Sequence, residues 1–141
     1  RRDVLRGTQS RSDSVSEDEA SELTDLYGAV ESDQGSVVWA WTQLRLGRIK
    51  FFAGDVSSAA EHYHAVSEQM PPGPEKVRAL LDLARCCQEL GQSERQTKAA
   101  EAALALPNFE WWDRANEHFA PLADRTGNSK YMASRLKSTS P

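Results

Sequence analysis

Three glycines at nearly equal spacing constrain this chain more than any other feature. Gly54, Gly91 and Gly127 lie 37 and 36 residues apart, and each separates one stretch of helix-like apolar periodicity from the next. The residue seven positions before each glycine is small, and the one before that is large and apolar: Gly47, Ala84 and Ala120 after Leu46, Leu83 and Phe119. Self-similarity at this period indicates stacked helix pairs, because a single pair cannot bury both of its faces.

Apolar periodicity and helix-breaking residues divide most of the chain into helices. No short stretch alternates apolar and polar side chains between turn residues, so no strand is expected. Asp55 and Asn108 stand where helix N-caps are needed, and Ser93 with Gln96 has the spacing of a capping box. The sequence therefore predicts an all-α chain of about seven helices, over residues 16–31, 37–53, 56–70, 74–90, 94–106, 109–126 and 128–138.

The length suits one domain with a short tail at each end. A chain of 141 residues can bury enough surface to fold without a metal or a disulfide. Residues 1–15 are basic and serine-rich and are expected to be a flexible lead-in, residues 16–137 to form the helical domain, and residues 138–141 to fray. Because the chain opens on RRDVLRG without a methionine, we expect a soluble domain of a larger protein, cytoplasmic or extracytoplasmic.

The first period shows why small and large residues are spaced as they are. Two antiparallel helices approach closely only where a small side chain lies at their crossing, and Gly47 and Ala59 are placed for this. Tyr63 is then expected to fill the space toward the next pair, and Pro71 to end the second helix. The residues that correspond to Tyr63 in the next two periods are Ala100 and Leu136.

This pattern resembles the tetratricopeptide repeat, a family of helix-pair arrays. The first period carries the family's Leu-Gly, Ala, aromatic and Pro positions at the family's spacing: Leu46, Gly47, Gly54, Ala59, Tyr63 and Pro71. The second period keeps a thinner set: Leu83, Ala84, Gly91 and Ala100. The third period, which contains Pro121, is degenerate. The resemblance covers most of residues 16–137 and implies a right-handed α-solenoid of antiparallel helix pairs.

Two departures from the family pattern bear on function. Where the family has aromatic residues on either side of its Leu-Gly pair, this chain has Gln43 and Lys50. Family members that bind chaperone tails resemble one another in a clamp of Lys and Asn, whereas the matching residues here are Leu44, Arg48 and Asp82. We therefore do not expect this chain to bind a chaperone C-terminus in that manner.

No motif in the chain points to catalysis, a cofactor or a metal. A phosphate-binding loop, a His-Glu-x-x-His motif and a nucleophile elbow are all missing from the sequence. His62 and His64 are two residues apart on a helix and so point in different directions. Adjacent Cys86 and Cys87 are either a redox pair or, as we expect, buried apolar side chains. The net charge of −4 argues against nucleic acid as a partner, and no apolar run is long enough to span a membrane.

The resemblance implies a binding surface instead. In the family, the first helix of each pair lines a concave groove that holds a peptide. The matching residues here are aromatic, apolar or cationic: Trp41, Leu44, Arg45, Arg48, Phe51, Phe52, Arg78, Arg85 and Arg114. Arginine suits a bidentate contact with a carboxylate, so we expect an acidic ligand segment. The alternative is that these arginines form a solvated face and pair with acidic residues of adjacent helices.

We therefore expect a non-catalytic scaffold or adaptor that binds a protein or peptide segment without a cofactor. A second hypothesis is self-association, with Trp111 and Trp112 at the contact. If this aromatic pair is not a contact site, it belongs to the core or covers the end of the array. A third hypothesis is a regulatory or targeting domain of a larger enzyme or of a membrane-anchored envelope protein.

Overall fold

Every regular element in the described part of the chain is an α-helix, as the sequence predicts. The computed structural model describes residues 34–106 and 108–118, together with residues 21, 25, 28, 133, 134, 136 and 137, and of residues 109, 116 and 118 the backbone alone. The full helices of this part are α3 (Val37–Phe52), α4 (Val56–Gln69), α5 (Pro74–Glu89), α6 (Ser93–Leu104) and α7 (Phe109–His118). The ends of α3 to α6 agree with the predicted ends to within two residues.

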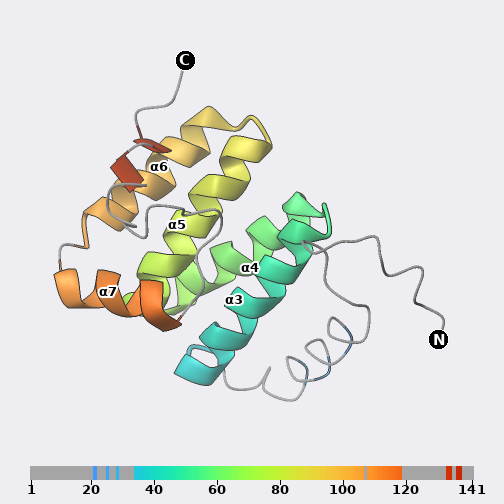
Figure 1. Ribbon diagram of the computed structural model, residues 1–141, viewed down its shortest axis with the longest axis horizontal. Helices are drawn as coiled ribbons and strands as arrows, with labels where there is room; N and C mark the ends of the chain where they lie inside the picture. The colour runs from blue at the N-terminus through green and yellow to red at the C-terminus, as the bar shows by residue number, and fades with distance from the viewer. Residues whose placement is uncertain are drawn as a thin grey trace.

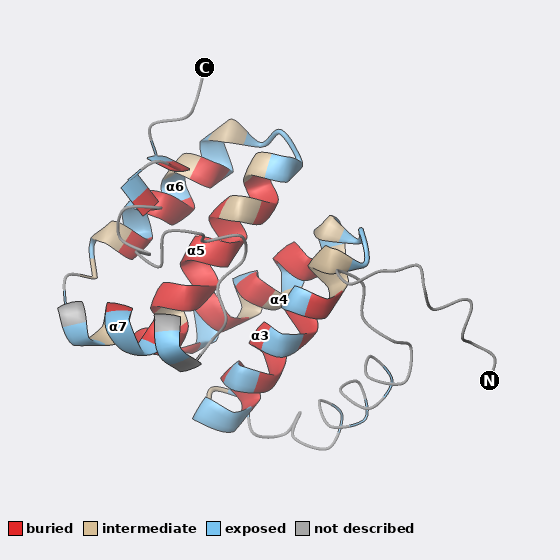
Figure 2. Ribbon diagram, viewed as in Figure 1, coloured by how far each residue is buried: buried red, intermediate tan, exposed pale blue. Residues whose placement is uncertain are grey.

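The helices from α3 to α6 pack one against the next, with α5 at the centre. Contacts join α3 to α4, α4 to α5 and α5 to α6, and α5 also touches both α3 and α7 (Figure 1). Figure 2 shows α5 buried along most of its length, whereas α3 and α4 alternate between buried and exposed faces. In the described residues, no helix is both long enough and apolar enough to cross a bilayer.

Two of the three evenly spaced glycines end their helices with the same backbone geometry. Gly54 and Gly91 have φ angles of +93° and +73°, which side chains with a Cβ rarely adopt. At each glycine the N–H donates to the carbonyl three residues earlier, at 3.1 and 3.2 Å. The N–H of the following residue donates to the carbonyl five residues before it, at 2.9 Å in both cases. Both ends are thus Schellman caps, 37 residues apart.

The predicted N-caps are correct in two places and wrong in one. The Asp55 carboxylate accepts from the N–H of Ser58 at 3.2 Å, and the Asn108 side chain accepts from the N–H of Glu110 at 2.9 Å. The predicted capping box at Ser93 does not form, because Ser93 is already the first residue of α6, and the side chain of the N-cap residue Gln92 accepts no hydrogen bond from a backbone N–H of the first turn.

The Gln96 side chain, predicted to close that capping box, lies in a buried tertiary contact. Its Nε2 donates to the backbone carbonyl of Leu136 at 2.7 Å. Ala133 and Leu136 are buried against the same core, and Lys137 lies 3.8 Å from the Glu101 carboxylate. A long-range hydrogen bond therefore forms in place of the local one that the sequence spacing suggests.

The crossing of α3 and α4 is as close as the small residue at position 47 suggests. A Cβ built on Gly47 would lie 2.7 Å from Cε1 and from Cζ of the Tyr63 ring. Tyr63 and Ala59 are both fully buried. Tyr63 thus fills the space above Gly47 itself, whereas the spacing predicts Ala59 as the partner of Gly47 and Tyr63 nearer the next pair. In the second period Ala84 corresponds to Gly47 and Ala100 to Tyr63, and both alanines are fully buried.

Two other predictions lie largely outside the described residues. Of the helix expected over 16–31, only residues 21, 25 and 28 are described, and all three are helical. The third glycine of the series, Gly127, and the proline expected to kink the helix after Asn108 are not among the described residues.

Candidate functional site

One exposed face of α3 carries two arginines that lie against aromatic rings. The guanidinium carbon of Arg45 is 5.4 Å from the centre of the Trp41 ring, and that of Arg48 is 5.4 Å from the centre of the Phe52 ring. Trp41 is 37% exposed, both arginines are exposed, and Phe52 is half-buried. Residues at spacings of three and four lie on one side of a helix, so these four form a continuous strip, which we call the α3 ridge.

The aromatic rings hold the arginine side chains along the ridge. A cation over an aromatic face is stabilised by about 0.5–1 kcal/mol at an exposed position. Phe51 adds an edge-to-face contact with Phe52, with ring centres 5.4 Å apart. Arg48 makes no ion pair with a carboxylate in the described part of the chain, so its N–H groups remain available to a ligand.

Two of the predicted binding residues are buried and do not belong to this surface. Leu44 is only 5% exposed and belongs to the core, because α3 packs on more than one side. Arg78 is 3% exposed, and its Nη2 lies 2.9 Å from Oδ1 of Asp82, which is equally buried. Arg78 is therefore not a ligand-binding residue, since its charge is matched by an acidic residue one turn along the same helix.

Arg85 and Arg114 remain at the surface. Arg85 is half-buried on α5, and Arg114 is exposed on α7. The Nε of Arg85 and the Oε1 of Gln88 are buried one helical turn apart and find no hydrogen-bond partner among the described residues. A buried donor and acceptor of this kind are normally satisfied, by water or by a bound molecule. Contacts of α5 with α3 and with α7 bring together three helices that carry arginines at the surface, two on α3 and one each on α5 and α7.

Gln43, at a position where the family has an aromatic residue, pairs with His62. The Oε1 of Gln43 lies 2.7 Å from Nδ1 of His62, and Gln43 is 2% exposed. Burial lowers the pKa of His62 below its ordinary value, and the nearby positive charge of Lys50 lowers it further. The imidazole is thus neutral at neutral pH, with Nδ1–H donating to Gln43. Sequence reasoning misses this pair, although Gln43 itself is a visible departure from the pattern.

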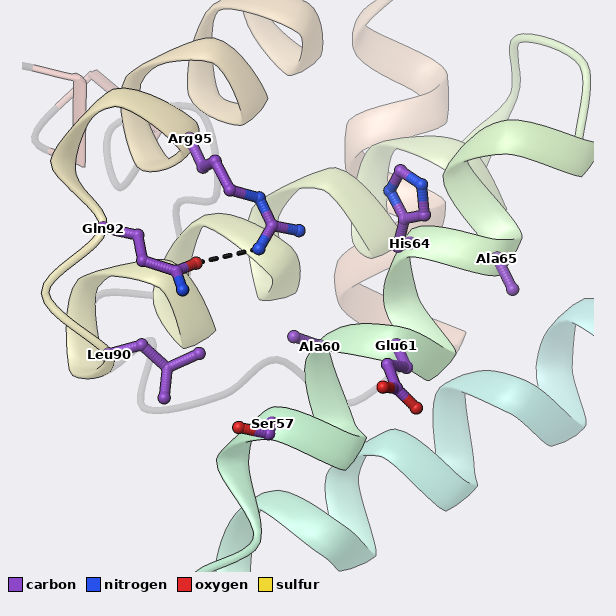
Figure 3. Close-up of a pocket in the computed structure, with 8 residues that line it drawn as sticks. All are labelled: Ser57, Ala60, Glu61, His64, Ala65, Leu90, Gln92 and Arg95. Atoms are coloured by element: carbon purple, nitrogen blue, oxygen red, sulfur yellow. Dashed lines mark hydrogen bonds between the residues drawn. The ribbon is translucent and has the colours of Figure 1, made fainter.

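His64 points away from His62, as its helical spacing predicts. It lines a hollow of about 330 Å³ between α4 and the start of α6, which we call the α4–α6 hollow (Figure 3). Sequence reasoning does not find this hollow, because its two walls are at least 25 residues apart in the chain. No group of three or more potential metal ligands among His, Cys, Asp and Glu occurs in the described residues.

The adjacent cysteines are buried, as expected. Cys86 and Cys87 have no exposed surface, and neither forms a disulfide. Burial raises the pKa of both thiols, and for Cys86 the nearby carboxylate of Asp82 raises it further. Since the thiolate is the reactive form, this environment disfavours thiol exchange and supports an apolar packing role.

The tryptophan pair belongs mainly to the core. Trp112 is 3% exposed, and its indole N–H donates to the carbonyl of Leu106 at 2.6 Å. Trp111 is half-buried and packs against the same core. The predicted self-association surface therefore lacks one of its two rings.

Comparison with known protein families, with curated proteins and with solved structures finds no match to this chain. The tetratricopeptide resemblance thus rests on the spacing of the chain's own residues.

Proposed function

We propose that this chain forms a tetratricopeptide-like array, a right-handed solenoid of about seven helices. Two observations support the proposal. The glycine caps of α3 and α5 are alike and stand 37 residues apart. The contacts of α5 with α3 and α7, together with its contacts with α4 and α6, are those of a first helix between two neighbouring pairs.

We infer that the array is a non-catalytic scaffold or adaptor that binds a segment of another protein along α3, α5 and α7. The α3 ridge is the observation that carries this inference. Exposed aromatic rings and arginines are the side chains most enriched at the energetic centres of protein interfaces. Here they are adjacent and already held in contact, so binding would order few additional side chains.

The ridge favours an acidic partner segment that also carries an apolar side chain. Arg48 and Arg85 occupy equivalent positions in the two periods, on helices that touch, and neither has a carboxylate partner in the described residues. The chain as a whole has a net charge of −4, so this cationic strip stands out from an acidic background. Carboxylates would bind the guanidinium groups, and the exposed part of the Trp41 ring would receive the apolar side chain.

Site-specific photo-crosslinking tests this assignment. A photoreactive phenylalanine analogue placed at Trp41 should crosslink a protein from the native host, and mass spectrometry should map the crosslink to an acidic segment. The same analogue at Glu68, an exposed residue of α4, is the matched control and should not crosslink that protein. Equal crosslinking from both positions, or a basic crosslinked segment, would count against the proposal.

Self-association is a second candidate, supported by a different observation. Val37 and Val38, at the start of α3, are 57% and 58% exposed beside Trp41. Exposed apolar side chains that cluster in this way occur at contacts between protein subunits. Light scattering should show a mass that rises with concentration if this candidate is right, and a constant monomer mass up to roughly 1 mM would remove it.

A further inference from the structure

The α4–α6 hollow is separate from the α3 ridge and has a chemistry of its own. Ser57, Glu61 and His64 of α4 line one side, and Leu90, Gln92 and Arg95 line the other (Figure 3). A volume of about 330 Å³ is at the lower end of the range for small-molecule sites. The hollow therefore suits a small molecule better than a protein segment.

Residues of opposite charge, Glu61 and Arg95, line this hollow from its two sides. Arg95 Nη1 donates to Gln92 Oε1 at 2.8 Å, and this bond holds the guanidinium where it reaches from α6 toward α4 (Figure 3). Glu61 lies on the α4 side, and in the described part of the chain no ion pair joins it to Arg95. A cation and an anion that line one hollow without neutralising each other match a ligand that carries both charges.

The rest of the lining is apolar. Ala60 and Ala65 of α4 form part of the wall, and Leu90 is 37% exposed although it is a large apolar residue. Leu90 is the residue before the Gly91 cap, where the chain turns sharply out of α5. The turn thus holds an apolar side chain at the surface, next to the two charged groups.

We propose that the α4–α6 hollow binds a free α-amino acid with an apolar side chain. The carboxylate of the ligand would bind Arg95, its ammonium group Glu61, and its side chain Leu90 with the two alanines. A ligand with one charge would leave the opposite charge of the hollow unmatched. This site shares no residue with the α3 ridge, so a test of amino-acid binding does not depend on the proposed scaffold function.

Titration of the full ¹⁵N-labelled chain with L-leucine, followed by NMR, tests the proposal. Amide signals of residues 57–65 and 90–95 should shift and saturate, with a dissociation constant of roughly 1 mM for so small and open a site. N-acetyl-leucine, which lacks the ammonium group, and leucine amide, which lacks the carboxylate, should each bind at least about fivefold more weakly. Binding of N-acetyl-leucine as tight as that of leucine would overturn the proposal.

Variants of the two charged residues complete the test. Glu61→Gln and Arg95→Gln should each weaken leucine binding at least about fivefold. Glu68→Gln and Lys98→Gln, which alter exposed residues of the same two helices outside the hollow, should leave it unchanged. All four positions are at the surface, so the variants should remain folded by circular dichroism. No saturable shift up to roughly 20 mM leucine, or equal binding by all four variants, would contradict the assignment.

Discussion

Replacing Gly47 with alanine is the sharpest test of how α3 and α4 fit together. The added methyl group would lie 2.7 Å from two ring atoms of Tyr63 and 3.1 Å from a third. Carbon atoms in contact normally stand about 3.5–4.0 Å apart, so the ring or a helix must move. Tyr63 is fully buried, which leaves the ring little room to turn aside.

Two effects of opposite sign decide the result. Alanine within a helix is favoured over glycine by about 1 kcal/mol. Forcing an extra methyl group into a packed crossing costs about 1–3 kcal/mol, and the shortness of two contacts places Gly47→Ala near the upper end. The net prediction is a loss of about 1–2 kcal/mol in the free energy of unfolding.

Urea unfolding of a double-mutant set would measure this. Tyr63→Leu shortens the facing side chain, so Gly47→Ala should be neutral or stabilising in that background, by up to about 1 kcal/mol. Gly28→Ala is the matched control, because Gly28 is also helical but a Cβ there would meet nothing within 4 Å. If Gly47→Ala stabilises the otherwise unchanged chain as much as Gly28→Ala does, the close crossing is refuted.

Three further predictions concern the buried groups and the caps. Because burial lowers the pKa of His62 below 6.5, the folded chain binds fewer protons than the unfolded chain as the pH falls past that value. The free energy of unfolding should therefore decrease as the pH is lowered from about 7.5 to 5.5, and the decrease should be smaller in His62→Gln. An equal decrease in the variant and in the unchanged chain would contradict a lowered pKa of His62. Gly54→Ala and Gly91→Ala should each lower the free energy of unfolding by about 1 kcal/mol, since both glycines have positive φ. Urea unfolding measures both losses, and a clear loss at one glycine with none at the other would contradict the view that the two caps are alike. A thiol reagent such as Ellman's should label Cys86 and Cys87 only after unfolding, and rapid labelling of the folded chain would show that they are accessible.

The helices and their ends could be predicted from the sequence because local residues determine them. Gly54 and Gly91 adopt the backbone angles that favour glycine, and Asp55 caps α4 through a residue three positions away. Five apolar residues recur at helical spacing in the sequence of α5, and all five are buried: Val77, Leu80, Leu81, Ala84 and Cys87. These features depend on neighbours in the chain, which are visible in the sequence.

The candidate surfaces could be predicted only in part, since they depend on which helices touch. Arg78 and Arg85 look alike in sequence, yet the structure buries the first beside Asp82 and leaves the second at the surface. Gln96 fits a capping box, but the carbonyl of Leu136, 40 residues away, binds its side chain instead. The α4–α6 hollow arises from residues that approach only in the folded chain.

Capture of the partner protein by a charge-reversal variant tests the central proposal most directly. The variant combines Arg48→Glu with Arg85→Glu. Its control, Arg95→Glu with Lys98→Glu, makes the same change in net charge on exposed residues of α6. The proposal predicts that the first variant remains folded by circular dichroism but loses the protein crosslinked from Trp41, and that the control retains it. Undiminished capture by the first variant would contradict the claim that this face binds an acidic segment.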